Sequence, residues 1–159
     1  MRALILTALV LAACSPSASV TTCSVDKLAS ADVVVENYAD CGTFDRSSPN
    51  YTDVAMSAAQ LCVLNAVSRK QGFYLAYDAT EPGSTTELRG AFTGVINDTG
   101  TLLVIHAYAG QGKVGASSFQ LVSERTCTTL AAADVCSPAV GVPCLTCTGP
   151  DTGSIACRH

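Results

Sequence analysis

The stretch VAMSAAQLCVLNAVSRKQGFYLAY, residues 54–77, decides the fold, because the spacing of its apolar residues changes once within it. From Val54 to Gln71 the apolar residues recur at helical spacing, which predicts an amphipathic helix. Gly72 is the residue type expected just after a helix ends. Phe73 to Tyr77 follows a period of two, which predicts a β-strand. A helix that leads directly into a strand indicates a domain built from both kinds of element.

The flanks of this helix carry residues that favour helix ends. Asn50 can cap the N-terminus, and Asp53, three residues later, has capping-box spacing. Arg69 and Lys70 suit the negative C-terminal end of the helix dipole. One face of the helix carries small residues and should pack closely on a sheet; its members are Ala55, Ala58, Ala59, Cys62 and Ala66. Cys62 lies in the middle of that face, so we expect its thiol to point inward, toward another buried cysteine.

Three further strands are expected, in residues 85–96, 101–108 and 117–127. Sequential strands with short connections predict an antiparallel meander. The predicted fold class is therefore α+β, with one helix packed on a four-stranded antiparallel sheet and a disulfide-rich, irregular C-terminal tail. In outline this architecture is similar to cystatin-like helix-on-sheet domains, a likeness of architecture that implies no activity.

The segments on either side of this core are less regular. Residues 26–31 could form a short helix and residues 33–35 a strand, and both alternatives stay open. Residues 128–134 favour a second short helix. The tail, residues 135–159, is rich in cysteine and has little periodicity, so its order must come from crosslinks and from packing on the domain of residues 23–134.

The first residues have the composition of an export signal, with Arg2 followed by the apolar run of residues 3–13. The run ends in Leu11-Ala12-Ala13-Cys14, which resembles the lipobox of bacterial lipoproteins. The resemblance implies thioether attachment of diacylglycerol to Cys14, cleavage after Ala13, N-acylation of the new terminus with a fatty acid such as palmitate, and anchoring to a membrane. By the sorting rule of that family, Ser15 favours the outer membrane over the inner one within the cell envelope.

The rest of the 159-residue chain suits a single domain. Residues 1–13 are the expected signal peptide, and residues 14–22, which are small and polar, are an expected flexible tether. The formal net charge is −4, and loss of Arg2 with the signal would make the mature chain more acidic still. This balance argues against a nucleic-acid partner, whereas the lipid makes a membrane the expected one.

Cysteine usage supports the same compartment, because the chain has 9 cysteines and setting Cys14 aside leaves an even number. An even number in an exported chain predicts a disulfide framework. The candidates are Cys23, Cys41, Cys62, Cys127, Cys136, Cys144, Cys147 and Cys157. Spacing does not determine the pairing; we favour Cys41 with Cys62, and the last four cysteines largely among themselves.

Candidate reactive groups are few, and each has a structural explanation. Cys144 and Cys147 form a C-x-x-C, but Pro143 and Pro150 leave no helix to lower a thiol pKa, so structural disulfides are favoured over a redox pair. A zinc site in the tail would combine these cysteines with Cys136 and with Cys157 or His159, but it lacks a second C-x-x-C. His106 stands alone within an expected strand. We therefore predict no catalytic residue, no metal and no cofactor.

Aromatic residues of the expected strands could form a patch on the sheet; they are Tyr74, Tyr77, Phe92, Tyr108 and Phe119. Strand propensity alone also explains them. The favoured hypothesis is a membrane-anchored envelope lipoprotein acting as a non-catalytic binding or accessory module. The alternatives are a thiol–disulfide redox protein using Cys144 and Cys147, and an inhibitor or immunity-type protein that binds an envelope partner through the sheet.

Overall fold

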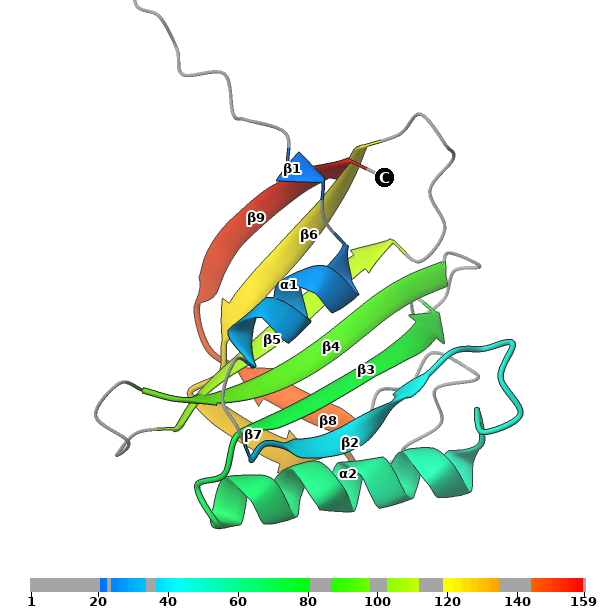
Figure 1. Cartoon of the computed structure of the whole chain (residues 1–159), viewed down its shortest axis with the longest axis vertical. Coiled ribbons are helices and arrows are strands. Elements are labelled where there is room, and N and C mark those ends of the chain that lie inside the picture. Colours follow the sequence, from blue (N-terminus) through cyan, green and yellow to red (C-terminus); the bar gives the residue numbers. More distant parts are fainter. Residues whose placement is uncertain are drawn as a thin grey trace, which may run out of the picture.

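The computed structural model describes residues 21–22, 24–33, 37–80, 87–97, 103–111, 119–134 and 144–158. These residues form an α+β fold: a mixed sheet, one helix on each of its faces, and a two-stranded hairpin (Figure 1). The expected signal peptide and most of the expected tether, with Cys14, lie outside the described residues.

The centre of the sheet is the meander that the sequence predicts. Its strands are β3 (Phe73–Thr80), β4 (Glu87–Ile96), β5 (Leu103–Gln111) and β6 (Phe119–Thr126). Each pairs antiparallel with the next, and the pairing of β3 with β4 runs without interruption over the whole of β3. The four-stranded core of the prediction is confirmed.

The edges of the sheet were not predicted. β2 (Ala39–Phe44) pairs parallel with β3, and β9 (Asp151–Arg158) pairs antiparallel with β6. At the outer edge, the two-residue β1 (Thr21–Thr22) pairs parallel with the end of β9. The order is β1-β9-β6-β5-β4-β3-β2, so the sheet is mixed rather than purely antiparallel.

The main helix, α2 (Asp53–Ser68), confirms the predicted helix, but its cap is different. The N-cap is Thr52 rather than Asn50: its backbone is extended, and its side-chain oxygen accepts a hydrogen bond from the Ala55 amide at 3.2 Å. Asn50 lies in the preceding turn, where its carbonyl accepts a hydrogen bond from the Thr52 amide.

The buried face of α2 is rotated from the predicted alanine face. The fully buried positions are Met56, Ala59, Val63 and Ala66, whereas Ala58 is exposed. Ala59 and Ala66 of the predicted face stay buried, and Met56 and Val63 join them, which removes more apolar surface from water than burial of Ala58 would. Cys62 is half-buried and forms the predicted disulfide with Cys41, with a Cα–Cα distance of 5.6 Å.

A second helix, α1 (Val25–Asp32), makes the single-helix prediction wrong and decides the open alternative for residues 26–31 in favour of helix. Ser24 caps it by accepting a hydrogen bond from the Lys27 amide. Val25 and Ala29 are its buried residues. They pack with Ala76 and Ala91 of the sheet, whereas residues 34 and 35 of the strand alternative lie outside the described part.

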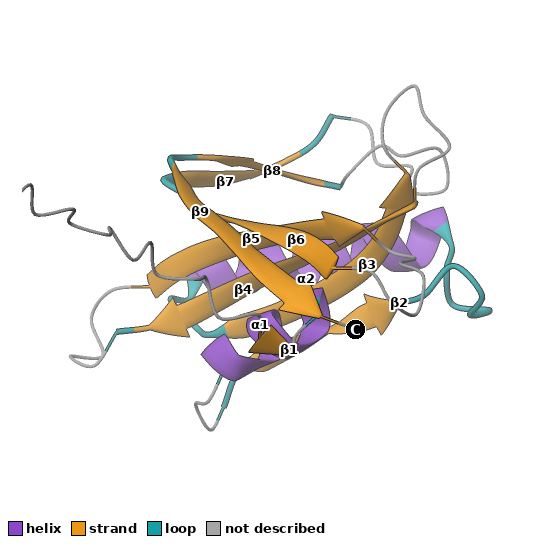
Figure 2. Cartoon of the chain, turned by 90° about the horizontal axis from the view of Figure 1, so that it is seen from above, coloured by secondary structure: helices purple, strands orange, loops and turns teal. Residues whose placement is uncertain are grey.

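The two helices cover opposite faces of the sheet, as alternation along β3 shows. Phe73, Leu75 and Tyr77 belong to the core cluster that contains α2, whereas Tyr74 and Ala76 contact the cluster that contains α1. The hairpin lies on the α2 side: Figure 2 shows it and α1 on opposite sides of the sheet.

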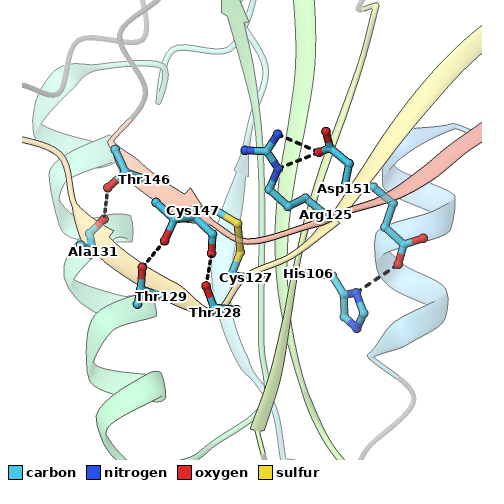
Figure 3. The surroundings of a disulfide bond; sticks show 11 residues. His106, Arg125, Cys127, Thr128, Thr129, Ala131, Thr146, Cys147 and Asp151 are labelled. Atoms are coloured by element: carbon cyan, nitrogen blue, oxygen red, sulfur yellow. Dashed lines mark hydrogen bonds and ion pairs between the residues drawn. A yellow bond between two sulfur atoms is a disulfide. The ribbon is translucent and has the colours of Figure 1, made fainter.

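The hairpin consists of β7 (Thr129–Ala132) and β8 (Leu145–Thr148). It overturns two predictions, because residues 129–132 of the expected second short helix form a strand, and the tail contributes β8 and β9 instead of being irregular. Its base is closed by a disulfide between Cys127 and Cys147, with a Cα–Cα distance of 5.2 Å (Figure 3). Cys147 thus pairs outside the last four cysteines, with a residue that lies just before β7.

Candidate functional site

The main candidate site is a cavity of about 330 Å³ at one end of the sheet. Four segments far apart in the chain line it: the end of α1 with Asp32, residues 37–38, residues 69–72 after α2, and residues 94–96 at the end of β4. A cavity of this size lies at the low end of the range for ligand pockets, about 300–1,000 Å³.

Two lining residues adopt a backbone conformation that side chains disfavour. Asn37 has a φ of 80° and Lys70 a φ of 53°, and they are the only non-glycine residues with positive φ in the described part of the chain. Asn tolerates this left-handed region, whereas a lysine there costs about 1 kcal/mol. Both strained residues of the described chain therefore lie at this cavity, the kind of place where functional sites hold strain.

Lys70 occupies the left-handed position because the chain must turn sharply from α2 into β3. The Gln71 amide donates a hydrogen bond back to the Ala66 carbonyl at 2.9 Å, which closes the helix end. The Gln71 side chain donates to the Asn37 carbonyl at 3.1 Å and so links the residue after Lys70 to the other residue with positive φ. The glycine expected at the helix end, Gly72, lies two residues beyond Lys70 and is not the left-handed residue.

Gly72 serves close packing instead. Its carbonyl accepts a hydrogen bond from the Ala39 amide at 2.8 Å. A Cβ atom at Gly72 would lie 3.1 Å from the Gly94 carbonyl oxygen and 3.6 Å from the Tyr38 Cβ. The cavity therefore has a wall of closely apposed backbone at the point where β2, β3 and β4 begin or end.

A buried polar cluster lies behind the cavity on the α1 face of the sheet. Asp32, at the end of α1, accepts hydrogen bonds on Oδ2 from the Tyr108 hydroxyl and, at 3.2 Å, from the fully buried Thr93 hydroxyl. Burial raises the pKa of Tyr108, and its hydrogen bond to the negative Asp32 raises it further. The Tyr108 phenol is thus held protonated as a donor to Asp32.

His106 extends this cluster toward β6. Its Nδ1 lies 3.0 Å from Oε1 of Glu124 on β6, but the two atoms are not aligned as a hydrogen bond. The imidazole also stacks on Tyr108, with ring centroids 6.3 Å apart. The histidine that seemed isolated in the sequence therefore has a carboxylate near it, because the β5–β6 register places Glu124 opposite Tyr108, two residues along from His106.

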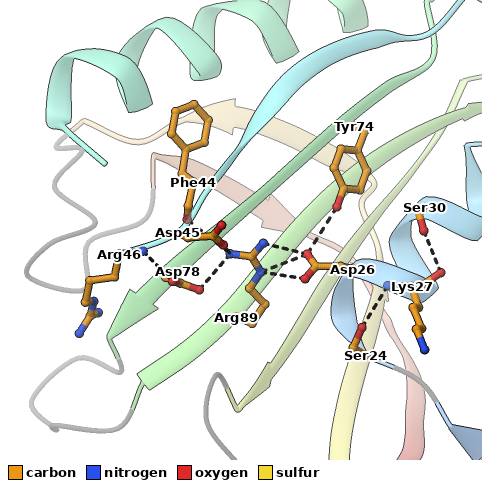
Figure 4. A network of polar contacts seen from close by, with 10 residues as sticks. All are labelled: Ser24, Asp26, Lys27, Ser30, Phe44, Asp45, Arg46, Tyr74, Asp78 and Arg89. Atoms are coloured by element: carbon orange, nitrogen blue, oxygen red, sulfur yellow. Dashed lines mark hydrogen bonds and ion pairs between the residues drawn. The ribbon is translucent and has the colours of Figure 1, made fainter. Parts of the chain in front are cut away.

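The other end of α1 is held by a buried guanidinium (Figure 4). Arg89 on β4 is 9% exposed and contacts three carboxylates. Its closest approaches are 3.0 Å to Asp26 on α1, 2.8 Å to Asp45 after β2, and 2.9 Å to Asp78 on β3. Burial alone would lower the pKa of Arg89, but the hydrogen bond and charge of Asp26, followed by those of Asp78, raise it overall.

This network was not predicted, because its members are 11 to 63 residues apart in the chain. Asp78 holds a further neighbour, since its Oδ2 accepts a hydrogen bond from the Arg46 amide at 2.7 Å. Tyr74 donates a long hydrogen bond of 3.4 Å to Asp26. We assign the network a structural role: it fixes α1 and the turn after β2 to the sheet.

The candidate redox pair is not joined. Cys147 is bonded to Cys127, and Cys144 is also disulfide-bonded, so neither offers the free thiolate that zinc or thiol exchange requires. Among the residues that the structure describes, no group of three or more His, Cys, Asp or Glu side chains is arranged to hold a metal ion. Cys23, Cys136, His159 and the Cys157 side chain lie outside that part.

The predicted aromatic patch is divided between the two faces. Tyr74 and Tyr108 lie on the α1 face, whereas Tyr77 and Phe92 lie on the α2 face. The latter two rings stack at 6.1 Å. Successive strand residues alternate between faces, so Tyr74 and Tyr77 cannot share one. The side chain of Phe119 is outside the described residues.

In the described part of the chain, neither helix has the length and apolar character needed to cross a bilayer. Comparison with protein-family models, curated proteins and solved structures finds no match for this chain. The cavity and its lining are therefore the basis for a functional proposal.

Proposed function

We propose that this chain is an exported, lipid-anchored protein of the cell envelope that acts as a binding module rather than an enzyme. The anchor is Cys14 of the lipobox-like Leu11-Ala12-Ala13-Cys14, and the favoured location is the outer membrane. Two disulfides, Cys41–Cys62 and Cys127–Cys147, support an oxidising compartment.

The observation that carries the binding role is the cavity of about 330 Å³ between the ends of the two helices. Its lining combines charged side chains, Asp32, Arg69 and Lys70, with the apolar Val95 and Ile96. Ligand pockets share this mixture, because apolar surface supplies affinity and a few polar groups fix orientation.

The polar groups beside the cavity support holding a ligand rather than moving a proton. Asp32 already accepts two hydroxyl hydrogen bonds, from Thr93 and Tyr108. Burial and Asp32 raise the pKa of Tyr108, which keeps that phenol from acting as an acid near neutral pH.

Binding is tested by purifying the full-length protein from envelope membranes and identifying the small molecules released on denaturation by mass spectrometry. Ile96→Trp places a larger side chain in the cavity lining, and Leu61→Trp, on an exposed residue of α2, is the matched control. We expect one molecule to be retained by the wild type and by Leu61→Trp but lost from Ile96→Trp. Equal retention by both variants, or none by the wild type, would contradict the proposal.

The anchor is tested separately, by growing cells with an alkyne-bearing fatty acid and comparing the wild type with Cys14→Ser. Label on the wild-type protein in the membrane fraction, and none on the variant, is the expected result. An uncleaved wild-type chain in the cytosol would refute the lipoprotein assignment.

A further inference from the structure

The charges around the cavity are divided by element. Asp32 stands at the C-terminal end of α1, whereas Arg69 and Lys70 directly follow α2. Helix C-terminal ends carry partial negative charge. At α1 the carboxylate adds to this charge, and at α2 two cations oppose it. The lining is therefore negative where α1 ends and positive where α2 ends.

Lys70 shows that the positive side is more than an accidental surface feature. The left-handed position at a helix end is most easily filled by glycine. A lysine there sacrifices stability, with its φ of 53°, and brings a charge to the cavity. The strained backbone at Lys70 therefore coincides with a side chain that adds a positive charge to the cavity lining.

The size and apolar part of the cavity limit the ligand further. About 330 Å³ suits a molecule smaller than a typical drug. Val95 and Ile96, at the end of β4, and Tyr38, which is 43% exposed, supply apolar surface. A ligand that matches the lining is small, carries an ammonium and a carboxylate group, and has an apolar portion.

We propose that the cavity binds a small amino-carboxylate zwitterion, a free amino acid or a short peptide with unmodified ends. This inference rests on the proposed binding role. The ammonium group faces Asp32, whose carboxylate has lone pairs beyond those used by Thr93 and Tyr108. The ligand carboxylate faces Arg69 and Lys70.

The test uses the full chain in detergent, with backbone amide NMR shifts of the lining residues as the readout. The probes are L-leucine, leucinamide, which lacks the carboxylate, N-acetylleucine, which lacks the ammonium, and leucylglycine. We expect saturable shifts with leucine or leucylglycine. Whichever of the two probes binds more tightly shows whether the ligand is a free amino acid or a peptide. The two blocked probes should bind at least about threefold more weakly, the effect of one partly exposed ion pair.

Variants assign each end of the ligand. Lys70→Gly should weaken leucine about three- to fivefold and leave leucinamide unchanged, and because glycine relieves the strain, the loss cannot come from unfolding. Asp32→Asn should weaken leucine and leucinamide but not N-acetylleucine. Lys27→Ala, on an exposed lysine of α1 outside the cavity lining, is the control and should change nothing.

Two results would overturn the inference. If leucinamide or N-acetylleucine binds as tightly as leucine, the cavity binds ligands but does not select zwitterions. If no probe gives saturable shifts at the lining residues, the ligand class is wrong, while retention of another molecule by the purified protein would still uphold the binding role.

Discussion

Lys70 adopts a backbone conformation in which glycine is the least strained residue, with a φ of 53°. Replacing it with glycine removes a cost of about 1 kcal/mol, offset in part by the greater freedom of glycine in the unfolded chain. We expect Lys70→Gly to raise the free energy of unfolding by up to about 1 kcal/mol, measured by urea denaturation.

The matched control is Lys27→Gly, because Lys27 is an exposed lysine inside α1 with a helical backbone. Glycine there should lower the free energy of unfolding by about 1 kcal/mol. If both variants shifted stability in the same direction, the strain assigned to Lys70 would be wrong.

Arg89 is the second residue that should contribute strongly to stability, because it is buried against three carboxylates. Arg89→Met keeps most of the side-chain volume but leaves Asp26, Asp45 and Asp78 close together without a cation. We expect the free energy of unfolding to fall by about 3–5 kcal/mol, measured by chemical denaturation at neutral pH.

Arg125→Met is the comparison, because Arg125 contacts Asp151 at 2.7 Å in a pair whose side chains are 43% and 68% exposed. Its loss should change stability by less than about 1 kcal/mol. Equal losses of unfolding free energy for the two substitutions would show that burial does not make the Arg89 contacts more stabilising than an exposed ion pair.

At the scale of elements, the β7–β8 hairpin depends on a glycine that follows it. A Cβ atom at Gly149 would lie 1.9 Å from the Thr126 carbonyl oxygen, a backbone atom at the end of β6. Gly149→Ala must therefore move either β8 or the end of β6. We expect a loss of about 1–3 kcal/mol by thermal or urea unfolding, whereas Thr152→Ala, at an exposed position of β9, should have little effect.

The elements also show what the sequence could reveal. The meander and α2 were predictable because they are long enough to repeat a period several times. β2 (ADCGTF) and β8 (LTCT) are short and carry polar or small residues, so their pairing is decided by distant strands. α1 has only eight residues, too few for its apolar spacing to distinguish helix from strand.

The candidate site was hidden for a related reason. Its lining comes from four separate segments, and no pair of its charged residues forms a recognisable motif. Arg69 and Lys70 were explained by the helix dipole alone, and the strain at Lys70 is a backbone property that no residue pattern displays. Among the contacts between side chains distant in the sequence, the sequence correctly predicted one, the disulfide of Cys41 with Cys62.

At the scale of the whole molecule, tyrosines should govern stability in alkali. Burial raises the pKa of Tyr77 and Tyr108 above the ordinary value of 10.0, and the same holds to a lesser degree for Tyr51 and Tyr74. Below pH 10 these phenols are protonated in both states. Above it, the unfolded chain loses protons that the folded chain retains, so stability should fall as pH rises.

We expect a steep decline of the unfolding free energy above about pH 10, with phenolate absorbance appearing together with unfolding. Tyr77→Phe should make the decline shallower, because Tyr77 is buried in the apolar core cluster and its pKa is strongly raised. Phenolate absorbance that rises to completion while the fold remains intact would contradict the prediction.

The pairing of β1 with β9 places the start of the described chain beside its end, with Thr21 opposite Cys157 and Thr22 opposite Arg158 (Figure 1). A reporter or affinity tag fused after residue 159 would start beside β1, at the corner where the described chain begins. A tag inserted between β3 and β4, at residues 81–86, avoids that corner. Because Thr22 and Arg158 are neighbours, a circular permutant of the domain could join these two points with a short linker and begin between β3 and β4.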